Sequence, residues 1–467
     1  MSSRLWRRGE ITVFISLMLA VLLFFFQAAL ESARLAMLRS QMQEALELAE
    51  YSVLSEYHRE LLDLYDLFYL DLSYGGGAEK TEYLNQRLAE FLDANLSSGE
   101  TAGVDTWDYS RATDDRGSAY YEQAVSYMKQ KTGVSLLQRL KTYEEYGELA
   151  SENEESYAQA DARETQNLEE LKKRREEEEE KGTPDPVSNT NSLKRSSILN
   201  LAVKEPEKLS GKKADLSTVP SVRVLLEGTG PRGRNEPGVG NDVFFLAYLL
   251  EHFPDASEYL AENGENGPWL DYQLEYLIAG KDTDIGNLES VCGRLLAIRE
   301  GMNYTYLLSD SAKTAECAAL AAALVGVTMI PGLVEAVKQV LLLAWAFAES
   351  VLDVRRLLNG KKVAFYKDSS SWKLSLSGAL EMGSLSGFDE QEDSGGLQYR
   401  DYLGILLTLT GREQKVMRSL DAIEGVIREQ SGGRWFYMDQ CTDGFQMRAV
   451  CVNGQELSAE RWMGYEW

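Results

Sequence analysis

The sequence predicts a mainly helical, α+β protein: a long N-terminal transmembrane helix extends into an exterior helical unit, and an α+β domain with a small sheet follows. Three observations predict this class. An uncharged apolar run occupies residues 11–30, apolar residues then recur at helical spacing, and strand-like segments lie in the second half of the chain. Because 467 residues exceed the size at which one hydrophobic core stops growing, we expect two or three packed units outside the membrane.

The run over residues 11–30 is long enough to cross a bilayer. At the α-helical rise it spans about 30 Å, the thickness of the hydrocarbon core. Arg4, Arg7 and Arg8 precede it and, by the positive-inside rule, place the N-terminus in the cytoplasm. A cleavable secretory signal is the alternative, but the run is longer than a signal core and no small-x-small site follows. We therefore expect residues 1–10 to be a cytoplasmic basic leader of a single-pass protein of the cell membrane, with its bulk extracytoplasmic.

The helical pattern continues beyond the membrane. No Pro or Gly interrupts the chain between Gly9 and Gly75, and apolar positions follow one another at steps of three and four residues. We expect one helix of about 60 residues, roughly 90 Å long. Residues 31–150 then comprise the extended helix and a first exterior helical unit, broken by a polar stretch over residues 99–116.

Residues 151–240 predict a charged helix and a flexible linker. Residues 151–181 hold twelve acidic and six basic side chains with almost no apolar ones, which favours a solvated helix outside any core. Six of the nine prolines lie within residues 182–241, where a short helix is predicted only over residues 193–203. A domain boundary is expected here.

Residues 241–467 are expected to form the second exterior α+β unit. Its predicted segments are a helix over 243–253, a strand over 272–279, alternating segments over 362–366 and 372–376, a helical stretch over 399–428, and strands over 434–438 and 445–452.

Two apolar runs, residues 315–330 and 333–358, are the strongest hydrophobic features after the first helix. Neither offers twenty clean apolar residues, because Glu316, Lys338 and Glu349 interrupt them. We interpret them as buried helices of a globular core. A hairpin that enters the membrane is the alternative.

Composition excludes some classes of function. The net charge of −26, from 74 acidic and 48 basic residues, repels nucleic acid, so no nucleic-acid partner is expected. His58 and His252 are the only histidines and lie far apart in sequence, which leaves little for a metal site or for His-based acid–base catalysis. No G-x-S-x-G, H-E-x-x-H or phosphate-loop sequence occurs. Residues 228–233 match the dinucleotide-binding pattern, but Pro231 and Pro237 prevent an immediate helix, so we interpret them as a loop. We expect no enzyme, no cofactor, no metal and no catalytic residue.

The four cysteines do not form a disulfide framework. Cys292 and Cys317 are typical of buried small residues. Cys441 and Cys451 flank a short hydrophobic segment, and an oxidising compartment would permit a bridge across a hairpin. Two free thiols are the alternative.

The start of the chain resembles the type IV pilin and pseudopilin group, and is most similar to TadE/TadG-like proteins of tight-adherence (Flp-type) pilus loci. The resemblance rests on Arg8-Gly9, then Glu10-Ile11-Thr12-Val13-Phe14 and an aliphatic run. Phe14 stands where the pilin-type glutamate occurs, five residues after the glycine. The resemblance implies processing or topology positions at Arg7, Arg8, Gly9 and Glu10, and helix association through Val13, Phe14, Leu17 and Leu23.

The whole chain also resembles a family of uncharacterised bacterial proteins, of the DUF5702 type, that is associated with such loci. The residues that carry this resemblance are 11–14, 30–34, 276–281, 345–350 and 401–403. The family has no assigned catalytic residues.

Together these features predict a membrane-anchored, extracytoplasmic structural or accessory component of a Flp/Tad-type pilus or a related envelope assembly. Its expected partners are the lipid bilayer and other assembly proteins. Two alternatives stay open. The first is a membrane-tethered extracellular binding or sensor module whose leader is never cut, and the second is an exported hydrolase with an acidic site.

Overall fold

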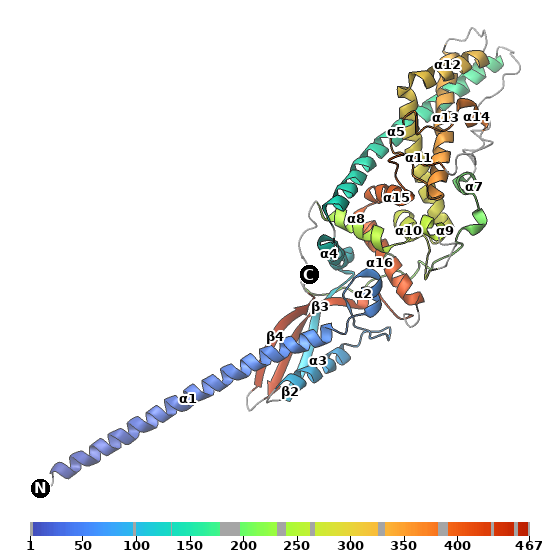
Figure 1. Ribbon diagram of the computed structural model, residues 1–467. Coiled ribbons are helices and arrows are strands. Elements are labelled where there is room, and N and C mark those ends of the chain that lie inside the picture. Colours follow the sequence, from blue (N-terminus) through green and yellow to red (C-terminus); the bar gives the residue numbers. More distant parts are fainter. Residues whose placement is uncertain are drawn as a thin grey trace.

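The computed structural model describes residues 3–96, 100–131, 133–177, 197–230, 240–261, 267–325, 332–381, 391–430, 434–452 and 456–465. It confirms a mainly helical protein with one small antiparallel sheet. Helix α1 extends from one end of the molecule, a sheet packs beside its base, and a large helical body lies beyond the sheet (Figure 1).

Helix α1, Ser3–Leu54, is the long apolar helix that the sequence predicts, but it is 52 residues long and ends earlier than expected. A turn separates it from α2, Arg59–Tyr65. His58 causes the new start, because its side chain accepts a hydrogen bond from the N–H of Leu61, while its own N–H donates to Tyr69 O at 2.8 Å. The amphipathic pattern therefore continues through two helices.

Four antiparallel strands form the sheet: β1 Leu70–Asp71, β2 Glu100–Arg111, β3 Cys441–Val452 and β4 Glu456–Gly464. β3 pairs along its length with β2 on one side and with β1 and β4 on the other. β2 corrects the prediction of a polar break over residues 99–116. Its residues become a strand because β3, from the other end of the chain, supplies the hydrogen-bonding partner.

The base of α1 packs on one face of this sheet. Alternate residues of β3, among them Phe445 and Met447, are buried there with Ala49 of α1 and with Leu88 of α3, Thr81–Asn95. Every second residue of β3 faces the helices, and residues at steps of three and four along α1 and α3 face the sheet. We call this cluster the sheet core. It fixes α1 to the rest of the molecule.

The helical body has a second, larger core. Its α-helices are α4 Asp114–Lys131, α5 Val134–Glu177, α7 Ile198–Ala202, α8 Asn241–His252, α9 Ala256–Ala261, α10 Gln273–Ala279, α11 Asp284–Ser309, α12 Ser311–Val325, α13 Leu333–Leu358, α14 Leu376–Glu381, α15 Tyr399–Thr408 and α16 Arg412–Glu429. The 3-10 turns are η1 Pro206–Lys208 and η3 Met438–Gln440.

Helix α13 contains a long, continuous buried segment of the body. Every residue over 341–354 is buried, which confirms the prediction of a core helix for residues 333–358. α12 packs beside it through Cys317 and Ala321, whereas residues 326–331 lie outside the described part. Among the described residues, α1 is the one helix that is long and apolar enough to cross a membrane.

The charged helix of the linker region exists as the later part of α5, but the expectation that it lies outside any core is wrong. Tyr157 is 5% exposed and donates to Glu300 of α11 at 3.2 Å. The helix over residues 193–203 is found as α7, while residues 178–196 lie outside the described residues.

Two strand predictions in the second half are wrong, those over residues 272–279 and 434–438, and the two alternating segments do not form strands either. Residues 272–279 form α10, a short apolar helix buried on all sides and ended by Gly280 in the left-handed conformation. Residues 362–366 and 372–376 are irregular apart from one bridge, Val363 to Leu397, and residues 434–438 lead into η3. Short apolar runs do not distinguish a strand from a buried helix. The strand over residues 445–452 and the helices over 399–428 are confirmed.

Two leucines of α1 test how firmly its base is held. Leu46 is 2% exposed and lies in the sheet core, whereas Leu48 is 50% exposed. Leu46→Ala should lower the free energy of unfolding by about 2–4 kcal/mol, because it leaves a cavity. Leu48→Ala is the matched control and should change it by less than about 0.5 kcal/mol. Urea unfolding of the chain in detergent micelles measures both, and equal effects would contradict the packing described.

Candidate functional site

The first candidate surface is the free part of α1. All residues over 11–30 are exposed, and none of them is charged. Val13, Phe14, Leu17 and Leu23 are between 58% and 64% exposed. At about 100° per residue, Val13, Phe14 and Leu17 share one face of the helix, whereas Leu23 lies about 180° from Phe14. The structure thus brings three of the four predicted association residues together.

The predicted processing positions Arg7, Arg8, Gly9 and Glu10 lie in the first turns of α1. Their side chains are outside the described part of the structure. α1 continues without interruption after these positions, so residues 3–10 and the apolar run over residues 11–30 belong to one continuous helix.

The predicted Cys441–Cys451 bridge does not form. Both residues lie on β3, ten positions apart, which places them about 33 Å from each other along the strand. Both are buried free thiols, as are Cys292 and Cys317. The hydrophobic segment between them is the strand itself, so no hairpin brings the two sulfurs together.

The second candidate is a set of ionised side chains inside the helical body, which we call the buried charge network. Its members are Arg299 of α11, Glu349, Asp353 and Arg356 of α13, and Lys367 and Asp393 of the segments that follow. Their side chains are at most 1% exposed. Three positive and three negative charges balance, which is the condition for burying them together.

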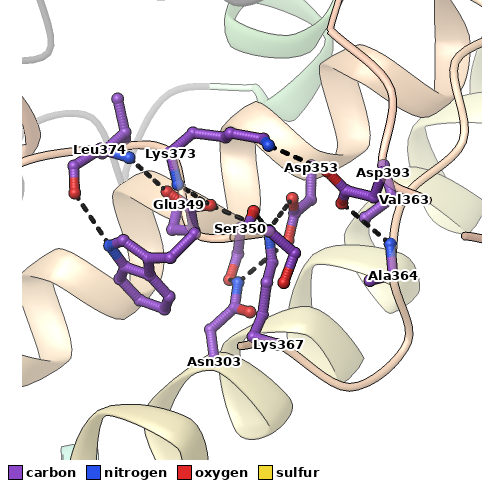
Figure 2. Close-up of polar contacts among 12 residues, drawn as sticks. Asn303, Glu349, Ser350, Asp353, Val363, Ala364, Lys367, Lys373, Leu374 and Asp393 are labelled. Atoms are coloured by element: carbon purple, nitrogen blue, oxygen red, sulfur yellow. Dashed lines mark hydrogen bonds and ion pairs between the residues drawn. The ribbon is translucent and has the colours of Figure 1, made fainter. Parts of the chain in front are cut away.

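Asp353 stands at the centre of the buried charge network (Figure 2). It accepts from Lys367 Nζ at 2.7 Å and from Arg299 Nη2 at 2.8 Å, and Asn303 of α11 donates to it at 3.1 Å. Burial alone would raise the pKa of Asp353, but the Lys367 ammonium and the Arg299 guanidinium outweigh it and hold that pKa below its usual value. The carboxylate is therefore ionised.

Glu349 connects the network to the chain beyond α13. One oxygen accepts from Lys367 Nζ at 2.8 Å and from the N–H of Lys373 at 3.0 Å, and the other accepts from the N–H of Leu374 at 2.9 Å. Asp393 pairs with Arg356 Nη2 at 2.9 Å and accepts from the N–H of Ala364 at 3.0 Å. These contacts fix two irregular segments against α13, so the network acts as a structural clamp.

A polar cleft of about 420 Å³ adjoins the clamp. Lys373 and Asp393 contribute to both, and Tyr146, Tyr366 and Asp368 line the cleft as well. Aromatic faces beside carboxylates and an ammonium are suited to a polar ligand of small size.

Glu275 of α10 is a fully buried carboxyl group with a raised pKa. Burial, and then the negative charge of Asp255, raises its pKa to about 8. One oxygen accepts from the N–H of Ala256 at 2.9 Å and from Tyr399 at 2.8 Å, and the other has no hydrogen-bond partner. The group is therefore neutral at pH 7. It does not line the polar cleft beside the clamp.

Sequence reasoning missed the buried charge network, although one signal was present. Glu349, Asp353 and Arg356 are spaced four and three residues apart, so they share one face of an otherwise apolar helix. Such a charged stripe within a core helix requires partners from elsewhere in the chain.

Removing one charge tests the clamp. Lys367→Met leaves Glu349 and Asp353 without their shared ammonium and should lower the free energy of unfolding by about 3–5 kcal/mol. The exposed Lys362 provides the control, because Lys362→Met should have little effect. Thermal and urea unfolding measure the difference. A Lys367→Met protein as stable as the control variant would show that the network carries no net stability.

Glu275 makes a prediction for pH dependence. Because its folded pKa of about 8 exceeds the unfolded value of 4.5, its stabilising contribution is full below about pH 4.5 and is lost as the pH rises through 8. Glu275→Gln stays neutral, so between pH 5 and pH 9 the wild type should lose about 3–5 kcal/mol relative to this variant. Unfolding titrations at several pH values measure the difference. The exposed neighbour Glu258, changed to Gln, is the control, and parallel curves for Glu275→Gln and wild type would refute the assignment.

Comparison with known proteins gives one match. A family model described as a family of unknown function, DUF5702, matches residues 175–452, more than half of the chain. No curated protein and no solved structure matches. The matched segment contains the buried charge network and begins after α1. The match therefore covers most of the helical body together with β3, and it does not include α1.

Proposed function

Since the chain belongs to the family of unknown function DUF5702, we propose its function from geometry: it is a membrane-anchored, extracytoplasmic structural component of an envelope assembly, of the pseudopilin-like kind found with Flp/Tad-type pili. It acts without catalysis, through lateral association of its anchor helix. The observation that carries the proposal is α1, whose free half is apolar and exposed while its base is packed into the body.

The attachment of α1 supports a structural role. Arg461 of β4 pairs with Glu47 at 2.6 Å and with Glu50 at 3.5 Å, and Tyr465 donates to Leu54 O at 2.7 Å. These polar contacts hold the base of α1 to β4 and to Tyr465, in addition to the apolar packing of the sheet core. An anchor held this way transmits its orientation in the membrane to the body, which a flexible tether does not do.

Charge supports the proposed topology. Arg4, Arg7 and Arg8 keep the N-terminus cytoplasmic, and the acidic exterior repels anionic lipid head groups. The body then stands away from the membrane on α1, where partner proteins rather than nucleic acid reach it.

The polar cleft favours a second candidate, a membrane-tethered binding or sensor module. N-terminal sequencing of the mature chain separates the two functions. A chain that begins at Glu10 supports the pilin-like proposal, whereas an intact Met1 supports the tether.

Single cysteines in α1 test lateral association. Leu17 lies on the face of Val13 and Phe14, and Leu19, similarly exposed at 55%, lies about 200° around the helix. Under mild oxidation in native membranes, Leu17→Cys should form disulfide-linked dimers, and Leu19→Cys should form them about fivefold less, because dimerisation requires the two faces to meet. The four natural thiols are buried and give a low background. Equal yields at the two positions, or dimers at neither, would reject the association face.

A further inference from the structure

Three side chains of the types that can serve as metal ligands meet where α2 contacts α8. Asp66 follows the last residue of α2, and Glu251 and His252 end α8. One potential ligand atom from each lies within 4.8 Å of the other two. Asp66 and His252 are separated by most of the first half of the chain, so sequence spacing gave no indication of this cluster.

The His252 imidazole is held in one orientation. Its ring packs against the rings of Tyr248 at 4.3 Å, Tyr127 at 5.9 Å and Tyr65 at 6.3 Å. Its Nδ1 lies 3.2 Å from Leu64 O, and because a carbonyl oxygen only accepts, Nδ1 carries the proton. A backbone carbonyl that fixes the tautomer in this way is the usual outer partner of a metal-binding histidine.

The other ring nitrogen has no hydrogen-bond partner. The His252 side chain is 7% exposed, and Nε2 points toward Asp66 Oδ2 at 3.6 Å, too long for a hydrogen bond. With the proton on Nδ1, Nε2 presents its lone pair toward the Asp66 carboxylate. Two acceptors that face each other across 3.6 Å offer paired ligand atoms to a cation.

The spacing fits a small tetrahedral ion. Ligand atoms at 2.0–2.2 Å from such an ion are about 3.3–3.6 Å apart, and the Nε2 to Oδ2 distance of 3.6 Å agrees. Glu251 is exposed, so its carboxylate can rotate the short remaining distance. One histidine, two carboxylates and a water would complete four ligands.

We propose that Asp66, Glu251 and His252 form a binding site for a divalent transition-metal ion of the zinc class. Bound there, the ion would join α2, next to the base of α1, to α8 of the helical body. Lys131 contacts Glu251 and donates to Tyr127 at 2.8 Å, so its ammonium competes with the ion for Glu251. Metal binding must displace it.

Titration of the full-length chain in detergent micelles tests the site, with Zn²⁺ as the calorimetric probe and Co²⁺ as the spectroscopic one. Mg²⁺ is added in excess to occupy surface carboxylates that bind divalent ions weakly, so that they do not contribute to the Zn²⁺ signal. The wild type should bind one equivalent with the visible absorption of four-coordinate Co²⁺. Asp66→Asn and His252→Gln should each weaken Zn²⁺ binding by at least about 10-fold. The matched control is Asp63→Asn, an exposed carboxylate on α2, which should bind as the wild type does.

The Lys131→Met variant provides a second test, whose expected result is a gain in affinity that a folding defect would not cause. Removing the competing ammonium should tighten Zn²⁺ binding about 10-fold by freeing Glu251, a gain that a purely structural role for the cluster does not produce. The proposal fails if the wild type binds no stoichiometric Zn²⁺, if Asp66→Asn behaves like Asp63→Asn, or if Lys131→Met leaves the affinity unchanged.

Discussion

The pairing of β2 with β3 is the interaction on which the rest of the structure depends. It joins two strands that are separated by most of the chain, and β4 and β1 add to the same central strand. Because the base of α1 packs on the face that these strands form together, the direction of α1 relative to the body follows from this pairing. The entropy cost of closing so long a loop grows only slowly with its length. The hydrogen bonds between two twelve-residue strands and the burial of one face of the sheet therefore offset it.

The helical body depends on a different constraint, the balance of charge around α13. Ionised groups lose hydration when they are buried, and this loss often equals what their mutual attraction returns. The network meets the requirement with three charges of each sign and with backbone N–H groups on Glu349 and Asp393. The network contributes by positioning parts of the chain. The irregular segments after α13 have few regular hydrogen bonds of their own, and the buried carboxylates determine where those segments lie.

The sequence was informative wherever structure is local. The long apolar helix, the core helix α13, helices α15 and α16 and strand β3 follow from periodicity over many residues. β2 could not be predicted, because its polar residues are a strand only when β3 is beside them. α10 was mistaken for a strand, since a seven-residue segment with five apolar residues fits both structures. The candidate sites were hidden for the same reason: Asp353, Lys367 and Arg299 come from separate segments, as do Asp66 and His252.

The position of β3 near the end of the chain has a consequence for biogenesis. Residues 11–30 are synthesised long before β3, the partner strand of β2. Until residues 441–464 arrive, the apolar side of the base of α1 has no sheet to cover it. A chain that lacks β3 and β4 would therefore leave the apolar side of the base of α1 uncovered and open to association or proteolysis. Because these two strands are synthesised long after α1, the helix becomes fixed to the sheet only once they have been made.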